Sequence, residues 1–325
     1  MSTRTAGAPA SPRLGRGASG SPERADGAGG RGARRRSPNR RLRWVGLLYL
    51  APALAMYTWV VLVPLVQSAN YSLYSWDGVS TPTFVGLGNY GDFFTDPDLR
   101  AALGHVGVLI CFFSFLPIAL GMLTAAIISR RNLRGAALFR SLLFLPQVVT
   151  TVVTAVVWKF LYTPDGPINT LLRALGLGAL AHNWLGDVGW ALPALGVIGT
   201  WVTFGFCMIL FVSGAQSIPQ ELYEAARCDG ASPVAEFFAV TLPGLRPQLA
   251  VALTLTITAA LRTFDLVYIA TQGGPGSATT TPALLLYRKA FQNPDVGAAA
   301  AIAVVLALAC LLVAILIQRV TEREA

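Results

Sequence analysis

Apolar residues occur in long runs along most of the chain, and polar residues are gathered between these runs. A helix needs about 20 mainly apolar residues to cross the hydrocarbon core of a bilayer. Prolines inside the runs, such as Pro64 and Pro117, are tolerated in membrane helices. The pattern therefore predicts an all-α membrane protein. Its six transmembrane helices are expected at 44–67, 101–129, 141–158 with an extension to 162, 188–214, 247–271 and 296–318.

The composition supports this interpretation and narrows the chemistry. Of the 325 residues, 54% are apolar or aromatic and 13% are charged, whereas soluble globular proteins carry about 25% charged residues. A soluble enzyme is therefore excluded. The four cysteines lack the paired spacing of a disulfide framework or a zinc site, and His105 and His182 lie far apart. We expect no metal site, no cofactor and no catalytic residue.

The net charge of +9 comes from one end of the chain. Residues 1–43 contain 11 of the 25 basic residues, all arginine, and few residues that could be buried. We expect a disordered cytoplasmic tail there, followed by a six-span domain over 44–320 and a short cytoplasmic tail over 321–325. A basic arm could bind nucleic acid, but the span that follows at once favours a topology signal. The first run is too long for a cleaved signal core, and we expect it to be retained.

The distribution of charge also predicts the orientation. The short loop 130–134 carries three arginines and should be cytoplasmic, whereas the loop between the first two runs is acidic and should lie outside. Six spans then place both termini in the cytoplasm. The loop 216–246 must be cytoplasmic too, although it holds four acids against two arginines. This departure from the charge rule indicates that the loop is kept for a partner.

Two glycine-rich stretches resemble nucleotide-binding motifs by letter only. The stretch 86–91 matches G-x-G-x-x-G, but that fingerprint needs a strand before it and a helix after it in a βαβ unit. The stretch 273–276 resembles a phosphate loop without the required lysine, and we expect a flexible turn there. We therefore predict no nucleotide site in this chain.

The segment 217–247 predicts two short helices outside the membrane. Ser217 can cap the first helix, and Gly230 stops it because glycine adopts the left-handed conformation without cost. Ser232 and Pro233 start the second helix, which Leu242-Pro243 ends. The pair could form a knob that inserts into a groove of a partner, or an amphipathic connection that lies on the lipid surface. The physics of the segment leaves both readings open.

Specific residues of this segment resemble a known family. The sequences Glu224-Ala225-Ala226, Asp229-Gly230-Ala231 and Leu242-Pro243, with Pro247, resemble the EAA loop of permeases of binding-protein-dependent ABC importers. The stretches 84–90, 264–268 and 271–276 are similar to the sugar-permease branch related to the maltose and glycerol-phosphate systems. The resemblance covers about residues 44–320 and favours the knob.

The resemblance implies the MetI-like fold of type I ABC importer permeases, with cytoplasmic coupling helices that dock on an ATPase subunit. The protein would be a non-catalytic subunit in a bacterial plasma membrane, forming half of the path for a carbohydrate. ATP hydrolysis would reside in the separate ATPase. The implied partners are that ATPase, a second permease in a heterodimer, an extracytoplasmic sugar-binding lipoprotein and the lipid bilayer, with no nucleic acid.

The resemblance also implies roles for individual residues of the loop. Glu224 would face a basic group of the ATPase, and Ala225 and Ala226 would allow close approach. Gly230 would supply the bend between the two short helices, and Asp229 would brace it. Cys228 departs from the aliphatic residue expected at its position. The coupling residues expected from the motif are Glu224, Ala225, Ala226, Asp229, Gly230, Ala231, Leu242 and Pro243.

A solute path is indicated by Arg262 and Asp265, which lie three residues apart in the fifth run. On one helix they would share a face, and charges within a span usually mark a cavity or a partner. They would border the solute path near the outer half of the membrane, or form an ion pair within the helix. The rival function is a secondary transporter driven by an ion gradient. A single candidate acid, Asp265, and the lack of a visible repeat disfavour it.

Overall fold

The computed structural model describes residues 40–129 and 135–323. It divides into two units, 1–56 and 57–325, each described here by itself. The described part of the first unit is helix α1 (Arg40–Tyr57), whose last residue opens the second unit. Because α1 starts at Arg40, the last four residues of the predicted tail are helical. Residues 1–39, the predicted cytoplasmic loop 130–134 and residues 324–325 lie outside the described residues.

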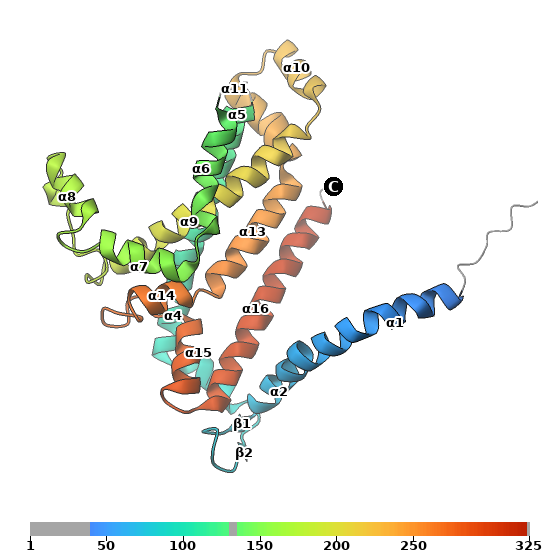
Figure 1. The fold of residues 1–325 in the computed structure, drawn as a ribbon, viewed down its shortest axis with the longest axis vertical. Helices are drawn as coiled ribbons and strands as arrows, with labels where there is room; N and C mark the ends of the chain where they lie inside the picture. The colour runs from blue at the N-terminus through green and yellow to red at the C-terminus, as the bar shows by residue number, and fades with distance from the viewer. Residues whose placement is uncertain (1–39, 130–134, 324–325) are drawn as a thin grey trace, which may run out of the picture. The chain divides into compact units, whose positions relative to one another are not determined.

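The second unit is almost entirely helical (Figure 1). In chain order its described elements are η1 (Thr58–Leu62), α2 (Val63–Tyr71), β1 (Tyr74–Ser75), β2 (Thr83–Phe84), α3 (Gly88–Thr95), α4 (Pro97–Ile110), η2 (Cys111–Phe115), α5 (Leu116–Ser129), α6 (Ala136–Val148), α7 (Thr151–Leu161), α8 (Pro167–Ala174), η3 (Gly178–Leu180), α9 (Ala191–Gln216), α10 (Gln220–Cys228), α11 (Pro233–Glu236), η4 (Phe237–Thr241), α12 (Leu242–Gly244), α13 (Arg246–Leu261), α14 (Asp265–Ala270), α15 (Pro282–Phe291) and α16 (Val296–Arg323).

Within the described residues, four helical stretches are long and apolar enough to cross a membrane: Tyr49–Tyr71, Pro97–Ile127, Ala191–Gln216 and Val296–Thr321. Two further stretches meet the test only as bent pairs, Leu138–Val148 with Thr151–Leu161, bent by 98°, and Pro233–Gly244 with Arg246–Leu261, bent by 71°. The total reaches the predicted six spans when each bent pair counts as one. The third run is bent between α6 and α7, and the fifth run is interrupted between Leu261 and Asp265, so neither forms the single helix that the hydropathy pattern predicts.

In the part of the chain that the structure describes, three helical stretches contain a widened, π-helical turn, and each of these turns ends two residues before a proline. The turns η1, η2 and η4 end at Leu62, Phe115 and Thr241, and the prolines are Pro64, Pro117 and Pro243. Proline lacks an N–H and its ring clashes with the carbonyl four residues earlier. A widened turn relieves that clash while the helix continues.

Threonines of α9 satisfy carbonyl groups that the η2 turn exposes. Thr200 donates from Oγ1 to the Phe112 carbonyl at 2.6 Å, and Thr203 donates to the Phe113 carbonyl at 3.3 Å. In a bilayer such groups have no water to bond, so side chains of a neighbouring helix must replace it. Helix α9 packs against α4, α5, α6 and η2 and contributes buried residues to two of the apolar clusters.

One end of this unit is formed by the two-stranded antiparallel sheet and the start of α16. Strands β1 and β2 pair Tyr74 with Phe84, and within the described residues no third strand joins them to form a βαβ unit. Asn89 donates from Nδ2 to the Ser72 and Tyr74 carbonyls, at 2.8 and 2.9 Å. The start of α16 closes on the same segment, because Val296 N–H donates to the Trp76 carbonyl at 2.8 Å. The G-x-G-x-x-G letters (86–91) follow the two-residue strand β2 and run into α3 (Gly88–Thr95), and the described residues contain no βαβ unit around them.

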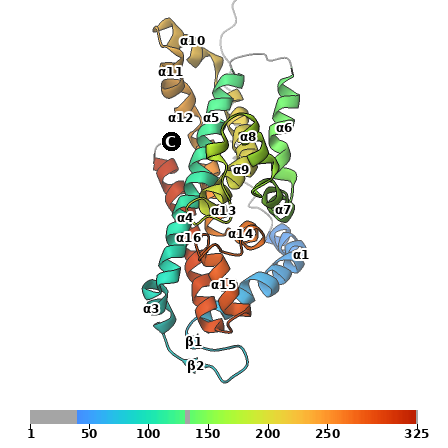
Figure 2. The same cartoon turned by 90° about the vertical axis from the view of Figure 1, so that its left-hand side faces the viewer.

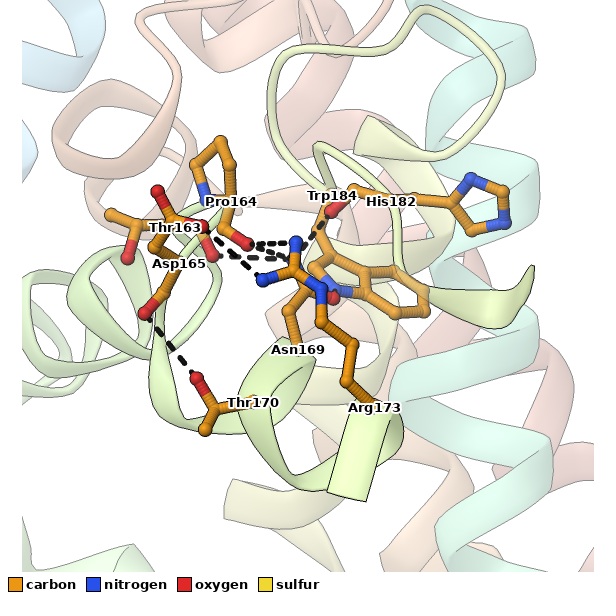
Figure 3. Close-up of polar contacts among 8 residues, drawn as sticks. All are labelled: Thr163, Pro164, Asp165, Asn169, Thr170, Arg173, His182 and Trp184. Carbon is orange, nitrogen blue, oxygen red and sulfur yellow. Dashed lines mark hydrogen bonds and ion pairs between the residues drawn. The ribbon is translucent and has the colours of Figure 1, made fainter. Parts of the chain in front are cut away.

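The segment between α7 and α9 is organised by a buried asparagine (Figure 3). Asn169 is 1% exposed. Its Nδ2 donates to the carbonyls of Thr163, Pro164 and His182, and its Oδ1 accepts from Trp184 Nε1 at 2.9 Å. Burial of an amide is favourable only when its donors and acceptors are bonded in this way. On the surface of the same segment Arg173 pairs with Asp165 at 3.2 Å.

The glycine-rich stretch 273–276 is a hydrogen-bonded corner and not an open turn. The hydroxyl groups of Thr271 and Thr279 are 2.7 Å apart, and Thr279 also donates to the Gly274 carbonyl at 2.8 Å. Thr281 donates to the Thr263 carbonyl at 2.9 Å and is fully buried. These bonds replace the flexible turn that the glycine content predicts.

Candidate functional site

The segment 217–247 lies at the opposite end of the second unit from β1 and β2 (Figures 1 and 2). No residue of α10 is buried within the described structure. Glu224 and Ala225 are exposed, and Ala226 is half-buried. Among the remaining motif residues Asp229 and Pro243 are exposed, whereas Ala231 and Leu242 are half-buried. The segment, called the coupling loop below, therefore projects an accessible small-residue helix, as its sequence predicts.

Gly230 ends α10 as expected, with φ of +76° and open space where a Cβ would lie. The N–H of Gly230 donates to the Arg227 carbonyl at 3.0 Å, and the N–H of Ala231 donates to the Ala226 carbonyl at 2.9 Å. These two bonds form the Schellman motif, in which a left-handed residue satisfies the last carbonyls of a helix. Glycine is favoured at this position because side chains disfavour positive φ.

The prediction that Ser217 caps α10 is wrong. Ser217 closes α9 instead, and its Oγ donates to the Gly214 carbonyl at 2.7 Å. Helix α10 begins after Pro219 without a side-chain cap. Ser232 does cap α11, since its Oγ accepts from the Ala235 N–H at 3.3 Å. The helix that follows continues through Leu242 and Pro243 to Gly244, one residue beyond the predicted end at Leu242-Pro243.

The two helices of the coupling loop are linked by an ion pair that the sequence analysis missed. Arg227 Nε donates to Glu236 Oε2 at 3.2 Å, and the side chain of Glu236 is only 4% exposed. The carboxylate raises the pKa of Arg227, so that the guanidinium stays charged. By contrast, the Asp229 side chain forms no hydrogen bond or ion pair with any described residue. The bracing role expected of Asp229 is thus not seen in the contacts of the described chain.

A second candidate site is a cavity of about 470 Å³ lined by α7, α9, α13 and the start of α14. Arg262 and Asp265 both line this cavity and both are exposed. They are not on one helix, because α13 ends at Leu261 and α14 starts at Asp265. Neither side chain forms a hydrogen bond or ion pair with another described residue. The reading as an ion pair within a helix is therefore wrong.

Polar side chains on the cavity wall add to these two charges. Thr154 is 2% exposed, and its Oγ1 has no hydrogen-bond partner among the described residues. Gln147 and Thr151 flank the break between α6 and α7, and Thr258 lies on α13. Irregular backbone at membrane depth is tolerated where it lines a cavity or is buried in protein. The hydropathy pattern could not reveal this wall, because single hydroxyl groups hardly alter the mean hydropathy of an apolar run.

The described chain contains no cluster of three or more histidines, cysteines or acids that could hold a metal ion. Cys228 and Cys111 are exposed, Cys207 is buried, and neither they nor Cys310 form a disulfide in the described chain. The arrangement offers an exposed helical loop and a cavity with polar groups on its wall.

Comparison with known proteins identifies the family. The family described as "Binding-protein-dependent transport system inner membrane component" matches residues 117–324, and the chain belongs to it. It is a membrane-spanning permease subunit of a transport system. The resemblance inferred from the EAA residues is thereby confirmed, and nothing in the comparisons favours the ion-gradient-driven carrier.

Two relatives and one solved structure illustrate the similarity. The chain is 37% identical over 262 residues to the probable ABC transporter permease protein YurN of Bacillus subtilis, covering 79% of this chain and 89% of the relative. It is 34% identical over 301 residues to the diacetylchitobiose uptake system permease protein NgcF of Streptomyces coelicolor, covering 89% and 85%.

The solved structure is a bacterial alginate ABC transporter in complex with an alginate pentasaccharide-bound periplasmic protein. One of its chains matches with a TM-score of 0.73 at 21% identity, covering 87% of this chain and 96% of that chain. Identity this low supports the fold alone. The predicted fold class, an all-α ABC importer permease, is confirmed by this match and by the family.

Proposed function

We propose that this protein is one of two membrane subunits of an ATP-driven importer and forms half of the translocation path for a carbohydrate. The observation that carries the proposal is the exposed coupling loop with the EAA residues Glu224, Ala225 and Ala226 on its first helix. Family membership supports the transport role. The carbohydrate class rests on relatives such as the diacetylchitobiose permease.

The coupling loop docks on a separate ATPase subunit, which hydrolyses the ATP. Glu224 faces a basic group of that subunit, and the short side chains of Ala225 and Ala226 allow the helix to approach a groove closely. Gly230 sets the bend, and Asp229, Ala231, Leu242 and Pro243 complete the shape of the loop. This chain itself performs no covalent chemistry. Its energetic role is to contact the ATPase differently in two conformations, so that ATP binding shifts their populations.

The remaining partners follow from the same assignment. A second permease, a different chain that forms a heterodimer with this one, supplies the other half of the path. An extracytoplasmic sugar-binding lipoprotein delivers the solute. When the ATPase subunits close on ATP, the coupling loops move and the cavity opens toward the binding protein.

The solute path passes the cavity that Arg262 and Asp265 line. A guanidinium donates hydrogen bonds and a carboxylate accepts them. Because neither group is paired within the described chain, both are available to hydroxyl groups of a sugar. The unpartnered Thr154 hydroxyl on the same wall adds a neutral donor and acceptor.

The distribution of charged residues supports an orientation of the chain in the membrane and a division into two tails and one domain. We propose a bacterial plasma membrane location with the Arg-rich tail (1–43) and the C-terminal tail (321–325) in the cytoplasm, on either side of the permease domain (44–320). The position of the coupling loop at the end opposite β1 and β2 supports this orientation. It separates the ATPase-docking face from the face that receives the binding protein.

The test is purification of the tagged protein from native membranes in a gentle detergent, with mass spectrometry of the recovered proteins. We expect a second permease, an ATPase and a sugar-binding lipoprotein. The recovered binding protein is then screened by thermal shift against radiolabelled mono- and disaccharides. The sugar with the largest shift, called the assay sugar below, serves for uptake measurements.

A charge reversal in the loop tests the docking role directly. Glu224→Lys should abolish uptake of the assay sugar and recovery of the ATPase while insertion stays normal. Asp165→Lys, a charge reversal of an exposed acid in the segment between α7 and α9 and far from the coupling loop in the sequence, is the control and should leave recovery of the ATPase normal. A chain that purifies alone and transports when reconstituted alone would refute the proposal in favour of a gradient-driven carrier.

A further inference from the structure

We propose that the ion pair between Arg227 and Glu236 is a positioning element that makes α10 and α11 move as one body during transport. The inference rests on the proposed docking of the coupling loop. It assigns a mechanical role to two residues that lie outside the EAA motif.

The backbone joint between the two helices does not fix their angle by itself. The linker after α10 is short, and its Asp229 and Gly230 are both exposed. A Cβ at Gly230 would meet no atom within 4 Å. Since no packing surrounds the turn, rotation about it must be limited by contacts elsewhere between the helices.

Those contacts are made by one face of α10. Tyr223 and Arg227 are four residues apart and therefore lie on the same face of the helix. Arg227 pairs with Glu236 of α11 at 3.2 Å, and the Tyr223 hydroxyl is 3.3 Å from Thr241 Oγ1 of η4. Glu221 and Glu224, three residues apart, are exposed. Glu224 borders the face that contacts α11, because it lies three residues before Arg227 and helps to raise the pKa of that guanidinium. The helix thus contacts α11 along one side and leaves the two acids accessible to a partner.

The space behind the inner face is polar. A cavity of about 240 Å³ lies between α10, α11, η4 and the end of α9, and Gln216, Gln220, Tyr223, Arg227 and Glu236 line it. Apolar packing does not fill the gap between the helices. The side-chain links across the cavity therefore provide the stiffness of the loop, and Arg227–Glu236 is the charged, and so the stronger, of the two described here.

A rigid coupling loop has a continuous route to the solute cavity. Helix α11 continues through η4 and α12, and α13 follows after a bend of 71°. The far end of α13 supplies Thr258 and Ala259 to the cavity wall, and Arg262 follows directly. Displacement of α10 by the ATPase reaches this wall only when α10 and α11 keep their relative angle.

The pair makes a specific energetic prediction. The Glu236 carboxylate is 4% exposed, so removing Arg227 takes a positive partner away from a buried charge, whereas replacing both residues by neutral groups removes that charge as well and costs less. Arg227→Gln should therefore impair coupling more than the double variant Arg227→Gln/Glu236→Gln, in which two amides can still bond. If the residues acted independently, the double variant would be worse than either single variant.

The experiment uses the complete importer in proteoliposomes, with uptake of the assay sugar and ATP hydrolysis measured together. For Arg227→Gln we expect normal recovery of the ATPase subunit but about tenfold less sugar transported per ATP, a value typical of coupling between two sites. The double variant should recover a large part of this ratio. Arg227→Lys, which keeps the charge, should lie between the single variant and the wild type.

The chain offers a matched control. Arg173 pairs with Asp165 at the same distance of 3.2 Å, and the two arginine side chains are almost equally exposed, at 52% and 53%, but Asp165 is 93% exposed whereas Glu236 is 4% exposed (Figure 3). Arg173→Gln should leave sugar transported per ATP unchanged.

Three results would overturn the inference. They are an unchanged transport ratio in Arg227→Gln, a double variant worse than both single variants, and loss of the ATPase from Arg227→Gln alone, which would make Arg227 a direct docking residue. A wild-type importer without ATP-dependent uptake would instead refute the proposed function, so the two failures are distinguishable.

Discussion

At the scale of single residues, Gly230 has a close counterpart elsewhere in the chain. Gly176 after α8 has the same φ of +76° and the same open surroundings. Its N–H donates to the Arg173 carbonyl, and the N–H of Leu177 donates to the Leu172 carbonyl. Both glycines thus end a helix with a Schellman motif. They differ in position, since Gly176 lies between α8 and α9 and Gly230 lies in the coupling loop.

Substitutions at these two glycines distinguish a local effect on the backbone from an effect on transport. Proline at either position cannot adopt the positive φ and removes the N–H of the motif, at a local cost of about 1–3 kcal/mol. Gly230→Pro should abolish uptake of the assay sugar, because the angle between α10 and α11 changes. Gly176→Pro should insert equally well and retain most uptake. Equal losses in both variants, at equal membrane abundance on immunoblots, would contradict a special role for Gly230.

The same residues show what local sequence can predict. The stop at Gly230 and the cap at Ser232 were predictable because each depends on a few neighbouring residues. Ser217 has the same chemistry as Ser232 but closes the preceding helix, a choice that depends on where α9 ends. The Arg227–Glu236 pair was not predictable, because the two residues come together only at the particular angle that α10 and α11 adopt on either side of Gly230.

At the scale of secondary structure elements, the apolar runs located the membrane helices but not their breaks. The run at 141–162 reads as one span, yet α6 and α7 meet at 98°. The run at 247–271 is divided at Arg262–Phe264, and its first helix is preceded by the bent stretch Pro233–Gly244. An apolar run is equally compatible with a straight or a broken helix, since hydropathy averages over the residues whose backbone turns. The π turns were not predictable from proline alone, because Pro52 and Pro146 lie inside α1 and α6 without such a turn.

The hairpin end depends on a close approach that can be tested. A Cβ on Gly297 would lie 1.9 Å from the Tyr74 carbonyl oxygen. Because the obstacle is backbone, Gly297→Ala should lower the stability of the importer by about 3 kcal/mol, the upper part of the range for overpacking. Thermal unfolding in detergent, followed by fluorescence, should show a lower Tm.

Gly107 provides the control, because a Cβ there would meet nothing within 4 Å. Alanine in place of glycine inside α4 should be neutral or raise stability by up to about 1 kcal/mol. An unchanged Tm for Gly297→Ala would mean that α16 does not pack on β1 as closely as the geometry shows.

At the scale of the whole molecule, the fold class and the family were predictable because the apolar runs and the family motifs that indicate them are spread over many residues. The sequence could not predict which of those residues share a cavity. Arg262 and Asp265 were singled out because charges are rare in apolar runs. Their neighbours Gln147 and Thr154 are more than a hundred positions away along the chain and became visible only when α7 and α13 were brought together.

Substitutions in the solute cavity and in the coupling loop should impair sugar uptake in different ways. Arg262→Gln and Asp265→Asn remove charged hydrogen-bonding groups from the cavity wall and leave the loop intact. Hydrogen bonds to charged groups contribute about 1.5–3 kcal/mol, so uptake of the assay sugar should fall by roughly 10- to 100-fold at low sugar concentration. ATP hydrolysis stimulated by the binding protein should persist. The loop variants, by contrast, should lose sugar transported per ATP at every concentration.

Uptake against sugar concentration in proteoliposomes distinguishes the two patterns. Asp92→Asn, an exposed acid on α3 outside the cavity, controls for loss of one negative charge and should transport normally. Unaltered uptake kinetics in both cavity variants would show that Arg262 and Asp265 do not contact the sugar during transport. A parallel fall of ATP hydrolysis and uptake would instead place the two residues in the movement that links the α13–α14 break to the ATPase.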